Sequence, residues 1–371
     1  TVRMKHYYEN IKGWFDFERV YQFAVRGLSG RFLEVGSYRG KSSAYMAVEI
    51  VNSGKNIEFT CCDTFRNEDC PTFQDLPGDN LPAFESHMGQ FPFVKVLQGK
   101  STEVAESFED GYFDFIFIDA SHDYESVKKD IEVWLPKLRP GGLIGGHDYS
   151  DYWPGVKQAV AEIFHADFTV IDNSWIHVKE NPTCKFPLQV VMMNYKDKRK
   201  IHFTQELEKY GIEYSEFECL THENGTIGNA LTFQAIFKAN QGKDIIILED
   251  DVKFLLDPSQ IDFSLFPDDW DVIYLGANLQ EQCGYVNDKV RRVHGAWTTH
   301  ACAYRASFID RVLKEFDPLR DLCFDEWLRI NANSLNLYIT YPIYATQING
   351  WSEINKKEIN YQCIFNSQEK L

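Results

Sequence analysis

The chain has 371 residues, 44% of them hydrophobic and 25% charged, which is ordinary for a globular protein and long enough for two domains. Its formal net charge of −17 argues against non-specific binding to nucleic acid or to anionic membranes, because either would require a basic surface. No stretch approaches the roughly 18 apolar residues of a transmembrane helix. The nine cysteines lack CxxC spacing, so we expect reduced thiols in a cytoplasmic protein.

Strand and helix patterns alternate along the first half of the chain. The predicted strands are 31–36, 56–63, 93–99, 113–120 and 143–148, followed by two strands within 167–180. The predicted helices are 14–28, 41–54, 101–108, 124–138 and 156–164, and residues 65–92 form an irregular insertion with a short helix. This alternation predicts a parallel, doubly wound sheet with an antiparallel end, whose ligands lie at the carboxyl ends of the strands.

Polar and glycine residues gather at these predicted strand ends. They are Glu34 and Gly36 at the end of the first strand, Asp63 at the end of the second, Asp119 at the end of the fourth, and His147 and Asp148 at the end of the fifth. The Gly-rich turn GSYRG at 36–40 would let the backbone approach a nucleotide closely. An acid at the end of the second strand is suited to bind ribose hydroxyls.

The order of four motifs carries a family resemblance. The motifs are, in chain order, EVGSYRGKS, CCDTF, FIDASHDYESVKKDI and LRPGGLIGGHDY. In this order they make residues 25–178 resemble the class I S-adenosylmethionine-dependent methyltransferases, above all the small O-methyltransferases of macrolide-sugar (macrocin) type. The resemblance implies S-adenosylmethionine, Mg²⁺ and a sugar hydroxyl as acceptor, and, since macrolide-sugar enzymes associate, a homo-oligomer. It implies that Glu34, Gly36, Ser37 and Gly40 line the methionine and ribose side, Asp63 binds the ribose, Ser101 lies near the adenine, Asp119 and Asp148 bind magnesium, and His122 is the general base.

The chemistry of an alcohol acceptor supports this assignment independently. A hydroxyl has a pKa far above 7, so its oxygen attacks a sulfonium methyl poorly unless a cation lowers that pKa and a nearby His accepts the proton. His147 departs from the pattern, because the resembling sugar enzymes usually carry an acid there. Structural roles stay open for three residues: Asp119 as the cap of the next helix, His122 as a loop residue and His147 as a structural side chain.

A second α/β pattern follows a short linker. We expect a first domain over residues 1–180, a linker over 181–187 and a second domain over 188–371, because the linker has two prolines and no periodicity. The predicted strands of the second domain lie within 187–195, 244–252 and 270–278, and its helices at 196–210, 226–240 and 306–316. The apolar strand IIILEDDV ends in Glu249, Asp250 and Asp251, which predicts a bound cation because clustered carboxylates repel one another.

The motifs around this strand carry a second resemblance. Residues 187–355 resemble glycosyltransferase family 25, the lipopolysaccharide and procollagen galactosyltransferase type. The resemblance rests on the order of six segments: VVMMNYKDKRKIHFTQELEKYGI, TIGNALTFQAIFKANQGKDIIILEDDV, WDVIYLGAN, AWTTHACAYRASFIDRVL, FDEWL and YPIYATQINGWSEI. The resemblance implies a compact A-type (GT-A) fold, Mn²⁺ and a nucleotide-diphosphate sugar, often UDP-galactose. It implies that Asp250 and Asp251 bind the metal, Asn194 and Arg199 the nucleotide, Gln347 the donor side, and that Asp325 and Glu326 lie near the acceptor.

Two features of the second half leave alternatives open. The segment GNALTFQAI stands where the family usually shows a Cys followed by Ser-His, so donor or acceptor choice differs or activity is lost. Asp325 is equally suited to cap the helix that follows it. The sequence therefore predicts a bifunctional glycan-modifying enzyme that acts on a sugar or glycoconjugate. The alternative is a small-molecule O-methyltransferase fused to a non-catalytic carbohydrate-recognition domain.

Overall fold

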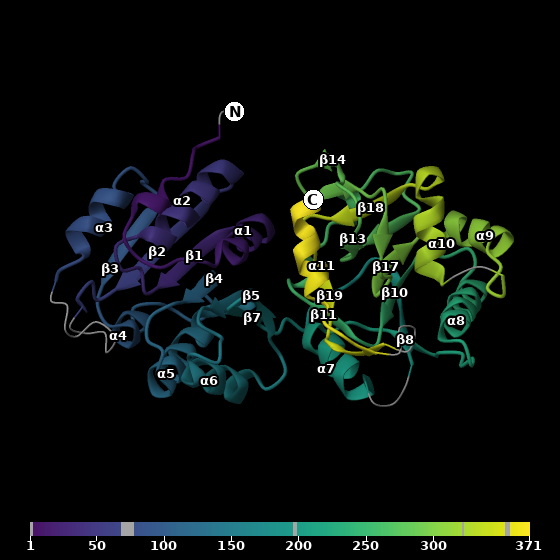
Figure 1. Ribbon diagram of the computed structural model, residues 1–371, viewed down its shortest axis with the longest axis horizontal. Helices are drawn as coiled ribbons and strands as arrows, with labels where there is room; N and C mark the ends of the chain where they lie inside the picture. The colour runs from purple at the N-terminus through teal and green to yellow at the C-terminus, as the bar shows by residue number, and fades with distance from the viewer. Residues whose placement is uncertain (1–2, 68–77, 196–198, 321–322, 353–356) are drawn as a thin grey trace. The chain divides into compact units, whose positions relative to one another are not determined.

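The structure is a computed structural model that describes residues 3–67, 78–195, 199–320, 323–352 and 357–371. The chain divides into two compact units, Thr1–Lys179 (unit 1) and Glu180–Leu371 (unit 2), each with its own sheet (Figure 1).

The described residues of unit 1 form a seven-stranded sheet in the order β3-β2-β1-β4-β5-β7-β6. Its strands are β1 (Gly30–Val35), β2 (Ile57–Asp63), β3 (Val94–Gln98), β4 (Phe113–Ile118), β5 (Leu138–Gly146), β6 (Thr169–Ile171) and β7 (Ser174–Val178). The neighbouring strands β3, β2, β1, β4 and β5 pair in parallel, whereas β7 pairs antiparallel with both β5 and β6. The predicted doubly wound sheet with an antiparallel end is therefore confirmed.

Helices cover both faces of this sheet. They are α1 (Glu18–Gly27), α2 (Lys41–Ser53), α3 (Leu81–Met88), α4 (Ser101–Ala105), α5 (Tyr124–Trp134) and α6 (Pro154–Phe164). Figure 1 shows α1 to α3 on one face and α4 to α6 on the other. The strands are apolar because both of their faces are buried, and the core beneath α5 and α6 includes Leu33, Ile116 and Trp134.

The segment RPGG lies inside a strand, although the sequence pattern predicted a helix over 124–138 followed by a turn. Helix α5 ends at Trp134, and β5 already begins at Leu138. The pairing with β4 shifts within this stretch, from Phe113 opposite Leu138 to Phe115 opposite Leu143. Gly141 has a φ of 71°, so the segment forms an irregularity in the strand rather than its boundary.

The described residues of unit 2 form an eight-stranded mixed sheet in the order β14-β15-β18-β12-β17-β10-β8-β9. Its strands are β8 (Gln189–Asn194), β9 (Ser215–Glu218), β10 (Ile245–Glu249), β12 (Val272–Tyr274), β14 (Gly284–Asn287), β15 (Val290–Arg292), β17 (Ala301–Tyr304) and β18 (Leu337–Thr340). Short pairs add β11 (Val252–Phe254), β13 (Asn278–Leu279), β16 (Ala296–Trp297), β19 (Ala345–Gln347), β20 (Gly350–Ser352) and β21 (Lys357–Ile359). The α/β prediction is confirmed for this unit, and the A-type glycosyltransferase fold stays a prediction.

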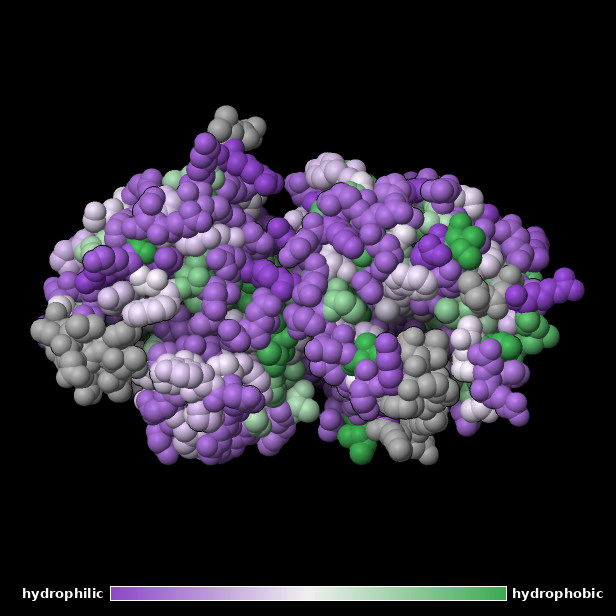
Figure 2. All heavy atoms as spheres, viewed as in Figure 1, coloured by the Kyte–Doolittle hydropathy of each residue, from purple (hydrophilic) through white to green (hydrophobic). Residues whose placement is uncertain are grey.

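The helices of unit 2 are α7 (Lys200–Tyr210), α8 (Gly225–Ala239), α9 (Ala306–Glu315), α10 (Phe324–Asn331) and α11 (Gln362–Asn366). Helices α8, α9 and α10 pack together, and Phe233 and Phe237 of α8 contact Phe324 of α10. Among the described residues, no helix combines the length and apolar character needed to cross a membrane. The face drawn in Figure 2 is mostly hydrophilic, with scattered hydrophobic residues.

Candidate functional site

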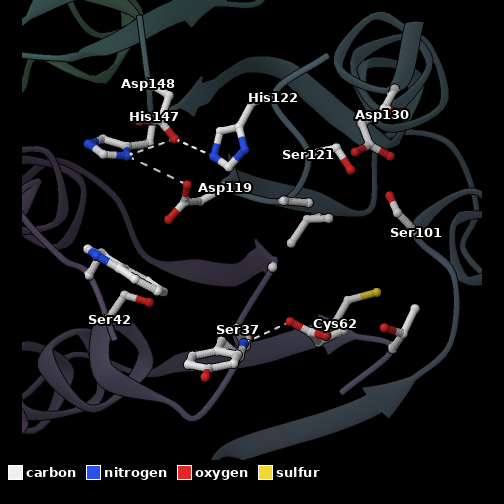
Figure 3. A pocket seen from close by; sticks show the side chains of 18 of the residues that line it. Ser37, Ser42, Cys62, Ser101, Asp119, Ser121, His122, Asp130, His147 and Asp148 are labelled. Carbon is white, nitrogen blue, oxygen red and sulfur yellow. Dashed lines mark hydrogen bonds and ion pairs between the residues drawn. The ribbon is translucent and has the colours of Figure 1, made fainter. Parts of the chain in front are cut away.

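A cavity of about 1260 Å³ lies in unit 1, where the strands from β1 to β5 end. Its walls come from the turns after these strands, from α5, and from residues 13–16 ahead of α1. Among the residues predicted to bind a cofactor or metal, those lining this cavity are Gly36, Ser37, Asp63, Ser101, Asp119, His122 and Asp148 (Figure 3). The parallel sheet thus brings residues from five separate strand ends to one place.

The turn after β1 requires glycine at position 36. Gly36 has a φ of 92°, and a Cβ built there would lie 1.9 Å from the carbonyl oxygen of Asp119. The ends of β1 and β4 can therefore meet closely only without a side chain at this position. Gly40, in contrast, lies outside the cavity wall, where it caps the start of α2 with a φ of 87°.

Asp63 is held in place by the backbone. Its two carboxylate oxygens accept hydrogen bonds from the Tyr38 N–H at 2.7 Å and the Phe65 N–H at 2.6 Å. Burial raises the pKa of Asp63 above its ordinary value, although these N–H groups lower it. Each oxygen keeps a second lone pair that a ligand hydroxyl can use.

Glu34 lies behind the cavity and not on its wall, contrary to its predicted place beside the cofactor. Its side chain is 1% exposed and accepts hydrogen bonds from Tyr21 Oη at 2.5 Å and from the Ser43 hydroxyl. These partners belong to α1 and α2, so Glu34 ties two helices to β1. A buried carboxylate needs such donors, which explains why it faces them and not the ligand space.

Two histidines and two carboxylates gather where β4 and β5 end. His122 Nε2 lies 2.8 Å from Asp148 Oδ2, and His147 Nδ1 lies 3.4 Å from the same oxygen and 3.6 Å from Asp119 Oδ1. Ligand atoms of Asp119, His122 and Asp148 all lie within 4.8 Å of one another, close enough for one metal ion to contact all three. The oxygens of Asp119 and Asp148 therefore fit a divalent cation, and His122 Nε2 lies directly beside that position.

His147 supplies positive charge to this group of carboxylates. Its Nε2 lies 2.5 Å from Asp16 Oδ1, in the segment ahead of α1. Burial disfavours the imidazolium, but hydrogen bonds to Asp119, Asp148 and Asp16 outweigh it and raise the pKa of His147 to about 12. Burial also raises the pKa of Asp148, but His122 and His147 outweigh this effect and hold it well below its ordinary value.

His122 offers the cavity a single usable nitrogen. Its ring stacks on Trp153 at a centroid distance of 4.1 Å and an interplanar angle of 17°. Its Nδ1 is buried and has no hydrogen-bond partner among the described residues, whereas Nε2 faces Asp148. Proton transfer to His122 in this conformation would therefore use Nε2.

Asp130 belongs to the same cavity, although the sequence analysis did not select it. It lies on α5, is 6% exposed and lines the cavity close to Ser101. The indole N–H of Trp134 donates to Ser101 Oγ at 2.7 Å. A signal was present, because Asp130 interrupts the buried stripe of Val127, Ile131 and Trp134 on α5.

The predicted metal ligands of unit 2 contact an arginine. Arg199 Nη1 lies 3.1 Å from Asp250 Oδ1 and 2.8 Å from Asp251 Oδ2. Gln347 Nε2 donates to both oxygens of Asp251 at 3.1 Å, and the Tyr195 N–H donates to Asp250 at 3.0 Å. Arg199, predicted to bind a nucleotide, is thus the counter-ion of the acidic pair.

Glu249 completes this acidic cluster at the end of β10. It accepts a hydrogen bond from Thr299 Oγ1 at 3.1 Å. Burial, and then the charge of Asp251, raise the pKa of Glu249 well above its ordinary value, and Asp325 adds to the effect. Gln347 is 8% exposed, and its Oε1 has no hydrogen-bond partner in the described part of the chain.

The remaining predicted residues of unit 2 have protein partners. Asn194 ends β8 and donates to Glu216 Oε1 at 2.6 Å. Asp325, in the first turn of α10, accepts from the Thr298 N–H at 3.3 Å, while Glu326 pairs with Arg329 at 2.7 Å. Asp325 therefore lies near the acidic cluster, and Glu326 is engaged along its own helix.

A curated relative, the uncharacterised protein y4gI of Sinorhizobium fredii, is 26% identical over 163 residues, which are 43% of this chain but only 18% of that protein. The chain thus spans about a fifth of this relative.

Similar solved structures include the O-methyltransferase NovP (17% identity, TM-score 0.37, 43% of this chain and 78% of that one). CalS11, a TDP-rhamnose 3′-O-methyltransferase of calicheamicin biosynthesis, is 16% identical (TM-score 0.32, 43% and 75%). The O-methyltransferase from Bacillus cereus, solved in complex with SAH, is 19% identical (TM-score 0.30, 43% and 78%). The family model described as "Methyltransferase domain" matches residues 33–149, the segment that contributes most of the cavity wall, and this region of the chain is therefore a methyltransferase domain.

Proposed function

We propose that unit 1 is an S-adenosylmethionine-dependent O-methyltransferase that acts on a hydroxyl of a sugar or glycoconjugate. One observation carries the proposal: a single cavity joins the glycine turn after β1, the acid that ends β2, and the group formed by Asp119, His122 and Asp148. The match of residues 33–149 to a methyltransferase domain supports it.

The cavity offers suitable partners for each part of this cofactor. The turn at Gly36 and Ser37 would receive the methionine and ribose side, because the backbone there is open to close approach. Asp63 would accept hydrogen bonds from the ribose hydroxyls with its free lone pairs. Ser101 would lie near the adenine.

The reaction would take place beside His122. The acceptor oxygen forms a bond to the methyl carbon, the bond from that carbon to sulfur breaks, and the thioether S-adenosylhomocysteine leaves. The proton of the hydroxyl passes to His122 Nε2, with Trp153 holding the ring in place. Asp119 and Asp148 would hold a magnesium ion, whose chemistry is to lower the pKa of a coordinated hydroxyl.

A sugar acceptor agrees with the rim of the cavity. Trp14 and Tyr152 line it and are 71% and 80% exposed, while Trp14 also contacts Tyr38 and Tyr152 contacts Trp153. Their flat faces suit the C–H surface of a sugar ring.

The test is binding followed by turnover. S-adenosylhomocysteine at 100 times its Kd should stabilise the fold by about 2.7 kcal/mol, seen as a higher melting temperature. Radiolabelled methyl transfer to a panel of sugars and glycosides would then identify the acceptor, with Asp119→Asn as the inactive control. An unchanged melting temperature at millimolar S-adenosylhomocysteine would exclude the cofactor assignment.

For unit 2 we propose transfer of a glycosyl group from a nucleotide sugar such as UDP-galactose, with Mn²⁺ at Asp250 and Asp251. The cluster of Glu249 with the buried Asp250 and Asp251 favours it, because so many carboxylates together are costly without a cation. Arg199 supplies that charge in this structure and would have to move aside.

A panel of nucleotide sugars with Mn²⁺ tests this second function. Nucleotide release from one donor, lost in Asp251→Asn, would support it. Glycan binding without release from any donor would favour the alternative, a carbohydrate-recognition domain without catalysis.

A further inference from the structure

The segment from Gly13 to Asp16 contributes to the unit 1 cavity, although it lies outside the methyltransferase match. It precedes the matched residues 33–149, and all four of its residues line the cavity. The sequence pattern predicted a helix from residue 14, but α1 begins only at Glu18, so residues 14–17 lie ahead of the helix. What this segment adds to the cavity is therefore not accounted for by the matched domain.

Two aromatic side chains hold the segment in place. Phe17 is 2% exposed and stacks on Phe117 of β4 at a centroid distance of 4.7 Å. Phe15 contacts Phe17 at 4.7 Å and a tyrosine of α2 at 5.0 Å. Trp14 and Asp16 alternate with these two residues, and 71% of Trp14 and 60% of the Asp16 side chain are exposed. The anchored backbone thus presents one indole ring and one carboxylate on the cavity wall.

Asp16 connects this segment to the reacting end of the cavity. Its Oδ1 lies 2.5 Å from His147 Nε2, and His147 Nδ1 lies 3.4 Å from Asp148 Oδ2, the oxygen that faces His122 (Figure 3). A carboxylate has about four acceptor positions, and the ion pair with His147 uses one of them. Because the Asp16 side chain is largely exposed on the cavity wall, it can accept further hydrogen bonds from a ligand.

An aromatic ring beside a carboxylate suits a sugar. The C–H groups of a sugar ring form an apolar surface that can pack on an indole, and its hydroxyls donate charge-assisted hydrogen bonds to a carboxylate. The hydroxyl that reacts would lie at His122 Nε2, which Asp148 and His147 separate from Asp16. A hydroxyl at Asp16 would therefore be a different one of the same acceptor.

We propose that Trp14 and Asp16 form an acceptor subsite of unit 1, in which the indole packs on the acceptor sugar and Asp16 accepts a hydrogen bond from a hydroxyl that is not methylated. This assignment rests on the proposed methyltransferase function and adds to it the residues that select the acceptor. An acceptor that lacks this hydroxyl loses the hydrogen bond to a charged group and binds less well.

The experiment compares one glycoside with its monodeoxy analogues. The glycoside is the one that gives the fastest transfer of radiolabelled methyl, and each analogue lacks one of its other hydroxyls. In wild type, one analogue should lose about 10- to 100-fold in kcat/KM, the range expected for a hydrogen bond to a charged group. In Asp16→Ala, that analogue and the parent glycoside should agree within about threefold. An effect of the variant on His147 acts on both substrates alike and cancels in this ratio.

Trp14 is tested by the split between KM and kcat. Trp14→Ala should raise the KM for the glycoside by about 3- to 10-fold and leave the kcat nearly unchanged, because the ring contacts the acceptor away from the reacting atoms. Trp14→Phe keeps a flat ring and should restore most of the affinity. Both positions are exposed, so these variants and Asp16→Ala should keep the wild-type melting temperature.

Asp172→Asn is the matched control for the change in charge. Asp172 is an exposed carboxylate of unit 1 that pairs with Arg19 of α1 and does not line the cavity. The variant should keep the wild-type KM and the wild-type preference for the parent glycoside. An equal loss of preference in Asp172→Asn and Asp16→Ala would overturn the proposal, since overall charge and not a specific contact would then explain it.

The remaining outcomes separate this proposal from the proposed function. If S-adenosylhomocysteine neither binds nor forms with any acceptor, the methyltransferase assignment itself fails. If it binds but no glycoside is methylated, the cofactor site stands and the sugar subsite is rejected. If wild type tolerates every deoxy analogue, or if Asp16→Ala keeps the preference, the role of Asp16 is rejected. A loss in Trp14→Ala that falls on kcat and not on KM would reject the placement of Trp14 against the acceptor.

Discussion

Strands β4 and β10 have the same sequence signature but end in different environments. Both are buried apolar strands that run into carboxylates, Asp119 after β4, and Asp250 and Asp251 after β10. In unit 1 the partners are His122 and His147, and the carboxylates line an open cavity.

In unit 2 the partner is Arg199, and the carboxylate side chains are only 1% and 5% exposed. The side chains of Asp119 and Asp148 are, in comparison, 21% and 19% exposed. An acid-ending strand therefore predicts a cluster of negative charge. Whether a ligand or the protein itself balances that charge depends on the partner that the rest of the fold supplies.

The largest expected effect that tests this difference between the units comes from removing Arg199, the charged partner of the carboxylates in unit 2. Arg199→Ala should destabilise unit 2 by about 3–5 kcal/mol, because it removes a cation that contacts both buried carboxylates. Urea unfolding of the full chain measures the effect. Arg329→Ala, which removes a more exposed partner of Glu326, should cost less than about 1 kcal/mol.

Adding Mn²⁺ to the Arg199→Ala variant tests whether the acidic pair of unit 2 can bind a cation. If Asp250 and Asp251 can hold a cation, millimolar Mn²⁺ should restore part of the stability of Arg199→Ala. Wild type, whose acidic pair is already neutralised, should respond less. No recovery in the variant would count against a manganese site in unit 2.

In unit 1, removing the charge of the carboxylate after β4 should affect methyl transfer more than stability. Asp119→Asn should lower methyl transfer by about 10²–10³-fold, because it removes a charge that would hold the cation and stabilise the reacting centre. Binding of S-adenosylhomocysteine and the properties of unit 2 should change little. A loss of less than tenfold would show that Asp119 is a structural residue.

We expect the titration of Asp130 to make the free energy of unfolding depend on pH, with an effect of intermediate size. Burial raises the pKa of Asp130 from an ordinary 3.8 to about 6, against the hydrogen bond from Ser101, which lowers it. Between these values the unfolded chain ionises while the folded chain stays protonated, so stability falls as the pH rises from about 4 to about 6. The loss amounts to about 2–3 kcal/mol.

Asp130→Asn should abolish that loss. Relative to wild type, the variant should gain on the order of 2–3 kcal/mol of unfolding free energy between pH 4 and pH 7, measured by denaturant titration without ligand. Parallel pH profiles for the two proteins would refute the assignment of the titration to Asp130.

The smallest expected effect on methyl transfer comes from changing Trp153, whose ring stacks on His122. Trp153→Leu removes a stacked contact worth about 0.5–1.5 kcal/mol, so methyl transfer should fall about 2- to 10-fold. Cofactor affinity should stay constant, because the change disturbs the orientation of the base. Tyr152→Leu, the exposed neighbouring position, should raise the KM for the acceptor and leave the kcat nearly unchanged.

The sequence by itself determined the local features of both units. Alternating apolar strands and amphipathic helices predicted the sheet of unit 1, because burial on both faces imposes that pattern. The residues at the ends of the strands, such as Gly36, Asp63 and Asp119, could be selected because parallel strands end at a common edge. The methyltransferase resemblance in this half is supported by the family match, whereas the glycosyltransferase resemblance stays a prediction.

Only the tertiary structure decided which charges meet. Glu34 is held by α1 and α2 and lies behind the cavity, although its position near the end of β1 suggested the cofactor site. Arg199 pairs with acids 51 and 52 positions away. Asp130 faces the cavity from a helix whose pattern indicated only burial. Sequence spacing fixes the order of residues along one element, but the energy of a buried charge depends on neighbours from other elements, and those neighbours are set by folding.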